Sequence, residues 1–297
     1  MMQGRSLPRL SWEAVVGAAL LTVTLAIVVA GPLVAPYDPT QVAVAAPNIP
    51  PSADHWLGTD WLGRDTFSRF LAGGREVLLL PFIAVVFAYV VAGLLGIYAA
   101  LHGGWLDAVI ARGFSLLLVL PPMLLGLVVL SAAGSSRIAM GGLLALVSFP
   151  RAGRVIRGAA QTVVGSEYVM AAVGRGERSL YIVRRELLPN IALPVLADLG
   201  VNLTYQIIFA SSLSFLGFGA QPPSADWGRM VADTMPLLTA TPLGALAPAV
   251  GIAMAAISVN LLAEALAQRL GGSRATRLGR GTSRSVTAPR TTVVKAV

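Results

Sequence analysis

The sequence contains no cysteine and few charged residues. Without cysteine, the 297-residue chain can form no disulfide, thiol nucleophile or cysteine-ligated metal site. Asp, Glu, Lys and Arg make up 12% of the residues, whereas about 25% is typical of a soluble domain. Hydrophobic residues make up 56%. A soluble domain of this length would need a charged surface that this chain lacks, so the composition predicts an all-α membrane protein.

Motifs for catalysis and nucleotide binding are absent as well. The sequence has no GxxxxGK[ST] phosphate loop, no GxSxG and no HExxH. Its two histidines, His55 and His102, lie in different predicted loops on opposite sides of the membrane. They are therefore too far apart to act as an acid–base pair. His55, Asp60 and Asp65 lack the spacing of metal ligands, and we interpret them as parts of a folded loop held by turns and side-chain hydrogen bonds. We expect no enzymatic activity, no catalytic or metal-binding residue and no cofactor in this chain.

The few charges are mostly positive and flank the apolar segments. The net charge is +8, and Lys295 is the only lysine, so arginine carries almost all of it. Basic residues beside apolar segments are typical of cytoplasmic membrane loops rather than of a nucleic-acid surface. We expect membrane lipid, and no nucleic acid, among the partners.

Six apolar runs predict six membrane-spanning helices, because about 20 apolar residues cross the roughly 30 Å of hydrocarbon in a bilayer. The runs cover residues 15–34, 77–100, 108–130, 138 to just beyond 150, 191–216 and 243–266. Loop 151–190 carries seven arginines against three glutamates. Arginine-rich loops stay in the cytoplasm, so this loop and both termini are predicted to be cytoplasmic.

This topology divides the chain into three parts. Residues 1–12 form a cytoplasmic N-terminus and residues 13–270 form the six-span domain. Residues 271–297 are basic, polar and without periodicity, which predicts a disordered cytoplasmic tail. Two external loops are expected, 35–76 and 218–242.

A few polar or helix-breaking residues lie within the predicted spans. Pro121 and Pro122 break the third span, either as a kink lining a pathway or as a fixed packing kink. With them we assign Asn202 and Gln206 of the fifth span to a translocation path. Asp198 and Glu264 lie near the cytoplasmic span ends, where a charge can be hydrated, so we do not expect them to couple transport to an ion.

The cytoplasmic loop contains two short helical patterns separated by glycines. Ser166 is placed to cap a helix over 167–173, and Glu167 in its first turn suits the helix dipole. Gly174 and Gly176 are expected to end that helix in a left-handed turn. A second helix over 178–187 is expected to stop before Pro189. The small side chains of Ala171 and Ala172 would let the first helix approach a partner protein closely.

The loop resembles a known motif. EYVMAAVGRGERSLYIVRRELLPN, residues 167–190, is similar to the cytoplasmic "EAA" motif of permease subunits of ABC importers. Met170-Ala171-Ala172 stands where Glu-Ala-Ala is usual, Gly176 holds the glycine position, and Leu188-Pro189 closes the pattern. Met170 departs from the usual acid and removes one polar contact.

Two external segments extend the resemblance to nearly all of residues 12–270. HWLGTDWLGRDTFSRFLAGGR, residues 55–75, is similar to the first external loop of the peptide and nickel subclass of these permeases. SFLGFGAQPPSADWGRMVAD, residues 214–233, is similar to the segment after their fifth span. The long loop after the first span most resembles the C-type permease of dipeptide or oligopeptide importers.

The resemblance implies a fold and two contact surfaces. The fold is that of a type I ABC importer permease, with six transmembrane helices and a coupling helix in the loop between spans four and five. The residues implied to contact an ATPase are Glu167, Tyr168, Met170, Ala171, Ala172, Gly176, Arg178, Leu188 and Pro189. The residues implied in the loops that face a binding protein are Leu57, Gly58, Thr59, Asp60, Gly63, Arg64, Asp65, Pro222, Pro223, Trp227 and Gly228.

The resemblance further implies a function and its partners. The chain would be a multi-pass subunit in a bacterial inner membrane, forming half of a translocation path for di- or oligopeptides. Its partners would be a homologous permease, an external solute-binding protein, and one or two ATPase subunits that bind ATP and Mg²⁺. A nickel or other small-solute importer of the same family is one alternative. An ion-coupled secondary transporter that works through Asp198 or Glu264 is the other.

Overall fold

Five helices in the described part of the chain are long and apolar enough to cross a membrane, and most of them are longer than the apolar runs that predict them. The computed structural model describes residues 12–239 and 241–279. The five helices are α1 (Trp12–Val34), α2 (Thr66–His102), α5 (Arg137–Val164), the continuous helix Ser179–Phe215 and α10 (Pro242–Gly279). The continuous helix consists of α7 (Ser179–Ile182), a π-helical turn (Val183–Leu187) and α8 (Leu188–Phe215).

The predicted third span is broken at the two prolines. Helices α3 (Gly104–Val119) and α4 (Pro122–Ala133) are bent by 83° relative to each other. Leu120 and Pro121 between them have extended backbone angles. Pro122 occupies the first turn of α4, where its missing N–H costs no helical hydrogen bond. If this bent pair counts as one span, the predicted number of six is reached.

Three predicted boundaries differ from the structure. The external loop ends at Asp65, because that side chain caps the start of α2, so residues 66–76 are helical. Helix α5 does not end where the fourth span is predicted to end, near Pro150, because it continues to Val164 through the arginine-rich segment. Helix α10 continues through residues 271–279 of the predicted tail, since two glycines weaken a helix by about 1 kcal/mol each relative to alanine without necessarily ending it. Residues 1–11 and 280–297 of the predicted terminal segments lie outside the described residues.

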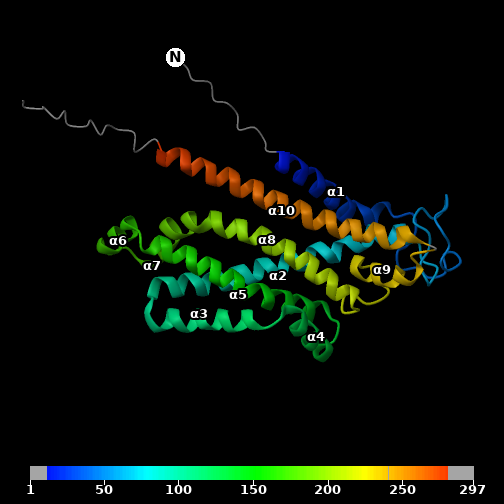
Figure 1. Cartoon of the computed structure of the whole chain (residues 1–297), viewed down its shortest axis with the longest axis horizontal. Helices are drawn as coiled ribbons and strands as arrows, with labels where there is room; N and C mark the ends of the chain where they lie inside the picture. Colours follow the sequence, from blue (N-terminus) through cyan, green and yellow to red (C-terminus); the bar gives the residue numbers. More distant parts are fainter. Residues whose placement is uncertain (1–11, 240, 280–297) are drawn as a thin grey trace, which may run out of the picture.

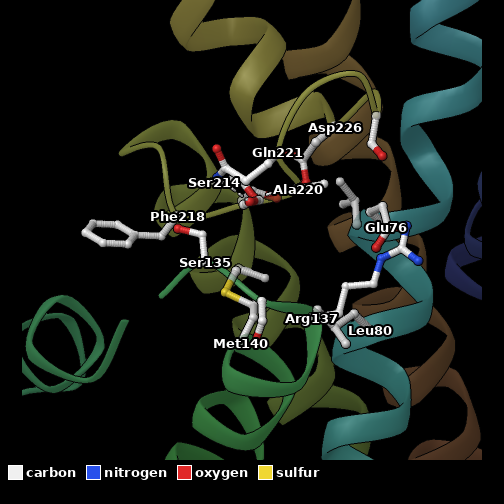
Figure 2. A pocket seen from close by; sticks show the side chains of 16 residues that line it. Glu76, Leu80, Ser135, Arg137, Met140, Ser214, Phe218, Ala220, Gln221 and Asp226 are labelled. Atoms are coloured by element: carbon white, nitrogen blue, oxygen red, sulfur yellow. Dashed lines mark hydrogen bonds and ion pairs between the residues drawn. The ribbon is translucent and has the colours of Figure 1, made fainter. Parts of the chain in front are cut away.

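The two ends of the helix bundle are structurally different (Figure 1). Loop 35–65 and the short helix α9 (Trp227–Thr234) lie together at one end. Helices α6 (Glu167–Gly174) and α7 lie at the other end, toward which α1 begins and α10 ends. This arrangement agrees with the predicted topology, in which loop 151–190 and the termini share one side of the membrane. We therefore call the first end external and the second cytoplasmic. At the external end, α2, α5 and α8 surround a pocket (Figure 2).

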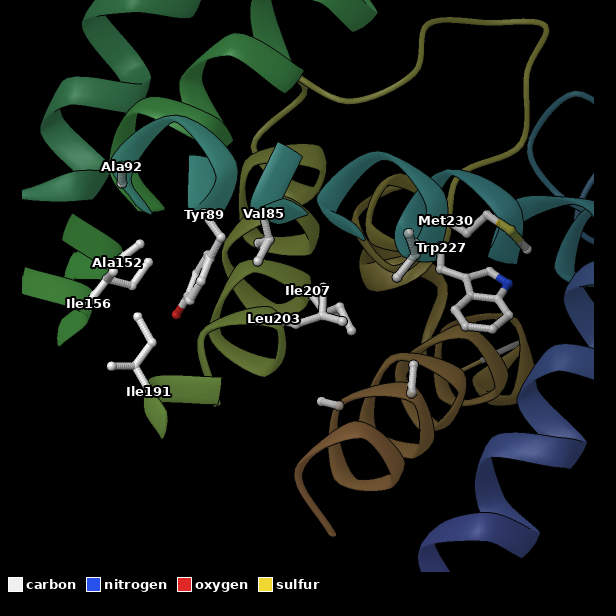
Figure 3. Packing of buried hydrophobic residues seen from close by; sticks show 13 residues of the cluster. Val85, Tyr89, Ala92, Ala152, Ile156, Ile191, Leu203, Ile207, Trp227 and Met230 are labelled. Atoms are coloured by element: carbon white, nitrogen blue, oxygen red, sulfur yellow. The ribbon is translucent and has the colours of Figure 1, made fainter. Parts of the chain in front are cut away.

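The main core joins α2, α5, α8 and α10 (Figure 3). Val85 and Tyr89 of α2, Ile156 of α5 and Ile207 of α8 are among its buried members. Trp227 of α9 extends this core toward the external end. A second cluster packs α4 against α5 and α8, and a third lies beneath α6 at the cytoplasmic end. The core therefore connects the external end to the cytoplasmic end through packed helices.

Candidate functional site

The segment around α6, residues 165–190, is anchored to the helix bundle on one side only. Val169 and Ala172 of α6 are buried against Ala160 of α5 and Ala100 of α2. We expected Ala172 to approach a partner, but its side chain is fully buried in this third cluster. A small side chain is needed there because the short helix packs directly on α5 and α2. We call residues 165–190 the coupling segment.

The other face of the coupling segment is exposed and largely apolar. Its large apolar side chains are at least 45% exposed in this chain. They are Tyr168, Met170, Val173, Leu180 and Tyr181. A group of exposed apolar side chains at one end of a chain is typical of an interaction surface. Met170, where the resemblance would place an acid, is thus part of an apolar face rather than a charged one.

The end of α6 has the geometry of a Schellman motif. The N–H of Gly176 donates to the carbonyl of Val173 at 2.9 Å, and the N–H of Glu177 donates to that of Ala172 at 3.2 Å. Gly176 has a φ of +75°, so the expected left-handed turn is confirmed there. Gly174 is helical and does not share that turn, because a single left-handed residue is enough to end the helix.

Ser166 precedes α6, but its side chain does not cap this helix as predicted. Ser166 has the extended backbone of a capping residue, but its hydroxyl caps no N–H of α6. The hydroxyl donates instead to the carbonyl of Val163 at 2.5 Å, at the end of α5. Ser166 therefore ties the start of α6 to the end of the long helix, and this helps to fix the angle between them.

The predicted stop before Pro189 is wrong, because a π-helical turn carries the helix through this proline. Pro189 has no N–H, and its ring would clash with a carbonyl of the preceding turn in a regular α-helix. The turn Val183–Leu187 is widened, and the N–H of Leu188 donates to the carbonyl of Val183. The side-chain amide of Asn190 donates to the carbonyl of Glu186 at 2.7 Å. The coupling segment is thereby continuous with the membrane helix α8.

The structure brings the predicted ATPase-contact residues together at the cytoplasmic end. All but one of them are exposed, namely Glu167, Tyr168, Met170, Ala171, Gly176, Arg178, Leu188 and Pro189. Ala172 is the exception. The exposed face also includes Val173, Leu180 and Tyr181, which the motif did not single out.

Ion pairs that sequence reasoning missed hold α5 to its neighbours near the coupling segment. Arg157 of α5 makes two hydrogen bonds to Asp107 of α3, at 2.6 and 2.5 Å. The side-chain amide of Gln161 donates to the same carboxylate at 3.1 Å. The partners are about 50 residues apart in the sequence, so local spacing gives no signal for this pairing.

Asp198 of α8 is held by two other helices. It accepts hydrogen bonds from the Tyr89 hydroxyl of α2 at 2.5 Å and from Nε of Arg151 of α5 at 3.2 Å. The Arg151 guanidinium also lies 5.3 Å from the ring centroid of Tyr205. A carboxylate held by an arginine and a tyrosine fits a structural role better than a proton- or ion-coupling role. Glu264, the other candidate, is exposed on α10.

The residues assigned to a translocation path do not share one surface. Pro121 and Pro122 are exposed at the break between α3 and α4. Asn202 and Gln206 are buried between helices of this chain, so they line no open surface in this structure. The amide nitrogen of Asn202 and the amide oxygen of Gln206 have no hydrogen-bond partner among the residues that the structure describes.

At the external end, loop 35–65 is held together by buried polar side chains. His55 Nδ1 lies 2.9 Å from Asp65 Oδ1, and Asp65 also caps α2 by accepting a bond from the N–H of Ser68 at 2.7 Å. Nε of Arg64 donates to Asp60 Oδ2 at 2.6 Å. This is the loop of turns and side-chain hydrogen bonds that the sequence predicts.

Trp227 joins α9 to the helix bundle. Its side chain is fully buried, stacks on Phe70 at 5.3 Å between ring centroids, and donates a hydrogen bond to the Phe70 carbonyl at 2.7 Å. Gly74 of α2 and Gly251 of α10 make room for the ring, since a Cβ at either would lie within 3 Å of it. The next residue, Gly228, packs as closely against the backbone of Ser211.

Asp226 connects α9 to the end of α8. Its carboxylate accepts bonds from the N–H of Arg229 at 3.1 Å and from the Ser214 hydroxyl at 3.0 Å. Burial raises the pKa of Asp226 above its ordinary value, and these hydrogen bonds oppose that rise. Asp226 thus serves as the cap of α9 and as a connection between two helices.

The predicted binding-protein loops lie at this external end, but most of the motif residues are internal. Gly58, Thr59, Asp60, Gly63, Arg64, Asp65, Trp227 and Gly228 are buried, and Leu57 is half-buried. These residues shape the surface rather than form it. The surface itself presents Pro222 and Pro223 of the prediction, together with Trp56 and Trp61, which are 61% and 49% exposed. We call loop 35–65 and residues 217–234 together the external platform.

Comparisons with known proteins give a family match and several relatives. Residues 92–272 match the family described as "Binding-protein-dependent transport system inner membrane component". The chain is 35% identical over 255 residues to a Brucella suis protein described as a peptide permease, covering 85% of this chain and 84% of that one. It is 31% identical over 257 residues to a dipeptide transport system permease protein of Alkalihalophilus pseudofirmus, with 86% and 84% covered.

A third relative is the glutathione transport system permease protein of Pectobacterium atrosepticum, which is 33% identical over 223 residues, with 75% of this chain and 74% of the relative covered. The family match spans more than half of the chain and includes the whole coupling segment. The chain therefore belongs to the family of inner membrane components of binding-protein-dependent transport systems, as a multi-pass permease subunit without a catalytic role.

Proposed function

We propose that this chain forms half of the translocation path of an ATP-driven importer for di- or oligopeptides. Membership of the family implies a binding protein and an ATPase as partners. We propose in addition a homologous second permease, one or two ATPase subunits that bind ATP and Mg²⁺, and contact with membrane lipid. Both termini and the coupling segment lie in the cytoplasm in this proposal, because the arginine-rich loop resists translocation.

One observation carries the proposal. The coupling segment exposes an apolar face at the end of the bundle that we assign to the cytoplasm, while its other face is packed on α2 and α5, and its π-helical turn continues into α8. A force applied to α6 therefore reaches three membrane helices directly. Closure of ATPase subunits against α6 would swing these helices between inward- and outward-open states, as in other hinge-type transitions.

The external platform complements this cytoplasmic surface. Loop 35–65 is rigidly hydrogen-bonded, and its exposed tryptophans and the segment at Pro222 face the external side. We propose that a peptide-loaded binding protein docks here through Trp56 and Trp61. Exposed aromatic side chains on a rigid scaffold are common anchors of protein interfaces.

Peptides are favoured over nickel or another small solute by the names of the relatives, which are a dipeptide and a glutathione transport permease. An ion-coupled secondary transporter is disfavoured because Asp198 is paired with Arg151 and Tyr89.

Proteoliposomes that contain this chain, its partner subunits and the binding protein test the proposal. We expect uptake of a labelled dipeptide that requires both ATP and the binding protein and that continues when proton and sodium gradients are collapsed. Uptake of nickel but not of dipeptide would select the other substrate class. Uptake by this chain alone, driven by an ion gradient, would contradict the proposal.

A further inference from the structure

The external end of the chain contains a polar pocket that has no role in the function proposed above (Figure 2). Its volume is about 300 Å³, at the small end of the range for sites that take small molecules. The pocket lies where the external ends of α2, α5 and α8 meet segment 217–226. It opens on the same side of the membrane as the external platform.

The walls of the pocket are rich in hydroxyl and amide groups. Five serine hydroxyls and one amide contribute, from Ser135, Ser136, Ser211, Ser214, Ser224 and Gln221. The hydroxyls of Ser211 and Ser214 already donate, to the Ile207 carbonyl and to Asp226, so they offer a ligand their acceptor oxygens. Val77, Leu80 and Met140 form an apolar part of the wall. Hydroxyls and amides match the N–H and C=O groups of a peptide bond without selecting a particular side chain.

One side of the pocket carries a pair of opposite charges. Glu76 of α2 and Arg137 of α5 lie 2.5 Å apart, and their side chains are 20% and 67% exposed. Neither makes another ion pair with a residue that the structure describes. Because the pair joins the external ends of two different helices, it can be opened without disturbing the buried core.

This combination of groups matches a zwitterion. A ligand with only a negative charge would be repelled by Glu76 and by the carboxylate of Asp226, and a purely cationic ligand would be repelled by Arg137. A short peptide presents an ammonium to Glu76 and a carboxylate to Arg137, so that it replaces one ion pair with two. Its amide group can then bond to the serine hydroxyls.

We propose that this pocket is a peptide-binding subsite of the permease, which receives the free termini of a di- or tripeptide released at the external platform. This inference rests on the proposed function and adds to it a direct contact between this chain and the substrate. Selectivity in such a site comes from the two termini and the backbone, so it accepts many side chains.

Filling the pocket tests its part in transport. Ser135 lies in the turn before α5, where a bulky residue breaks no helix, and Ser135→Trp places an indole among the lining groups. We expect dipeptide uptake in the reconstituted importer to fall to background, while stimulation of the ATPase by the binding protein persists. The control is Ser131→Trp, on an exposed position of α4 outside the pocket, which should transport normally. Normal uptake by Ser135→Trp would overturn the subsite.

A labelling experiment tests binding itself and does not depend on transport. Because the chain has no cysteine, Ser135→Cys provides a single reactive thiol. In proteoliposomes without binding protein, an excess of dialanine should slow its modification by a thiol reagent. Dialanine blocked at both termini should not slow this modification. Modification of the control variant Ser131→Cys should be unaffected by either form of dialanine.

The outcomes separate this inference from the function on which it rests. Equal protection by free and blocked dialanine, or no protection, would overturn the subsite even if uptake of peptides is normal. A wild-type importer that takes up no peptide would instead contradict the proposed function. A variant that fails to assemble with its partners is identified by loss of the stimulated ATPase activity. In that case the labelling experiment decides whether the pocket binds a peptide.

Discussion

Gly176→Val is expected to abolish transport although it changes no contact with the helix bundle. A Cβ at Gly176 would meet no atom within 4 Å, so no clash results. The φ of +75° is the difficulty, because a left-handed residue with a side chain costs about 1–2 kcal/mol and a β-branched one more. That penalty lowers the population of the folded Schellman turn about tenfold or more, and α6 loses the end that fixes its position.

Two matched variants separate this effect from a change in bulk. Gly174→Ala lies two residues earlier, on an ordinary helical backbone with no atom near a Cβ, and should transport normally. Gly176→Asn should retain much of the activity, since asparagine tolerates the left-handed region. Dipeptide uptake and recovery of the ATPase with the purified permease are the measurements. Full uptake by Gly176→Val would show that the turn has no part in coupling.

Trp227→Ala is expected to destabilise the external end severely. The side chain is fully buried, and its removal leaves a cavity between Phe70, Gly74 and Gly251 and removes the hydrogen bond from the indole to the Phe70 carbonyl. Replacing a buried tryptophan by alanine costs about 3–5 kcal/mol. Because α9 is attached to α2 and α10 through this ring, we also expect the binding protein to lose its ability to stimulate the ATPase.

Thermal unfolding of the purified protein in detergent measures the first effect. Trp61→Ala is the control for stability, because Trp61 is about half exposed and such surface changes stay within about 0.5 kcal/mol. Trp227→Phe should recover part of the lost stability by filling much of the cavity, but not the hydrogen bond to Phe70. An unfolding temperature of Trp227→Ala equal to that of the wild type would contradict the role assigned to this ring.

The sequence predicts the fold through local signals. Apolar runs locate the membrane helices, Pro121 and Pro122 locate the break between α3 and α4, and Gly176 locates the end of α6. Each of these features depends on residues close together in the chain, such as a helix-breaking proline or a left-handed glycine. The helix boundaries are less well predicted, because hydropathy reports contact with lipid rather than helix content.

Helix α5 illustrates this limit. Its segment with Arg151, Arg154 and Arg157 reads as a loop because arginine is excluded from lipid. The structure places these arginines on a helix that leaves the apolar layer, where Arg151 and Arg157 bond to Asp198 and Asp107. Such pairs join residues 47 and 50 positions apart, and no local pattern predicts them.

The candidate site was predicted by position but not by side-chain orientation. The EAA-like motif locates the coupling segment, yet its Ala172 packs inward while Tyr168 and Met170 face outward. In the same way, the external motif identifies the platform although Asp60, Arg64 and Trp227 are buried within it. A motif records residues that a fold needs as well as residues that touch a partner, and only tertiary packing distinguishes them.

The central claim is that the exposed face of α6 contacts an ATPase subunit. Its most direct test is cross-linking from Met170→Cys, which bears the only thiol in the chain, in native membranes treated with a photoactivatable thiol reagent. We predict that mass spectrometry of the purified adduct identifies a nucleotide-binding subunit, whereas Trp61→Cys at the external end captures none. Adducts of Met170→Cys with lipid alone, in membranes that import peptide, would contradict the claim.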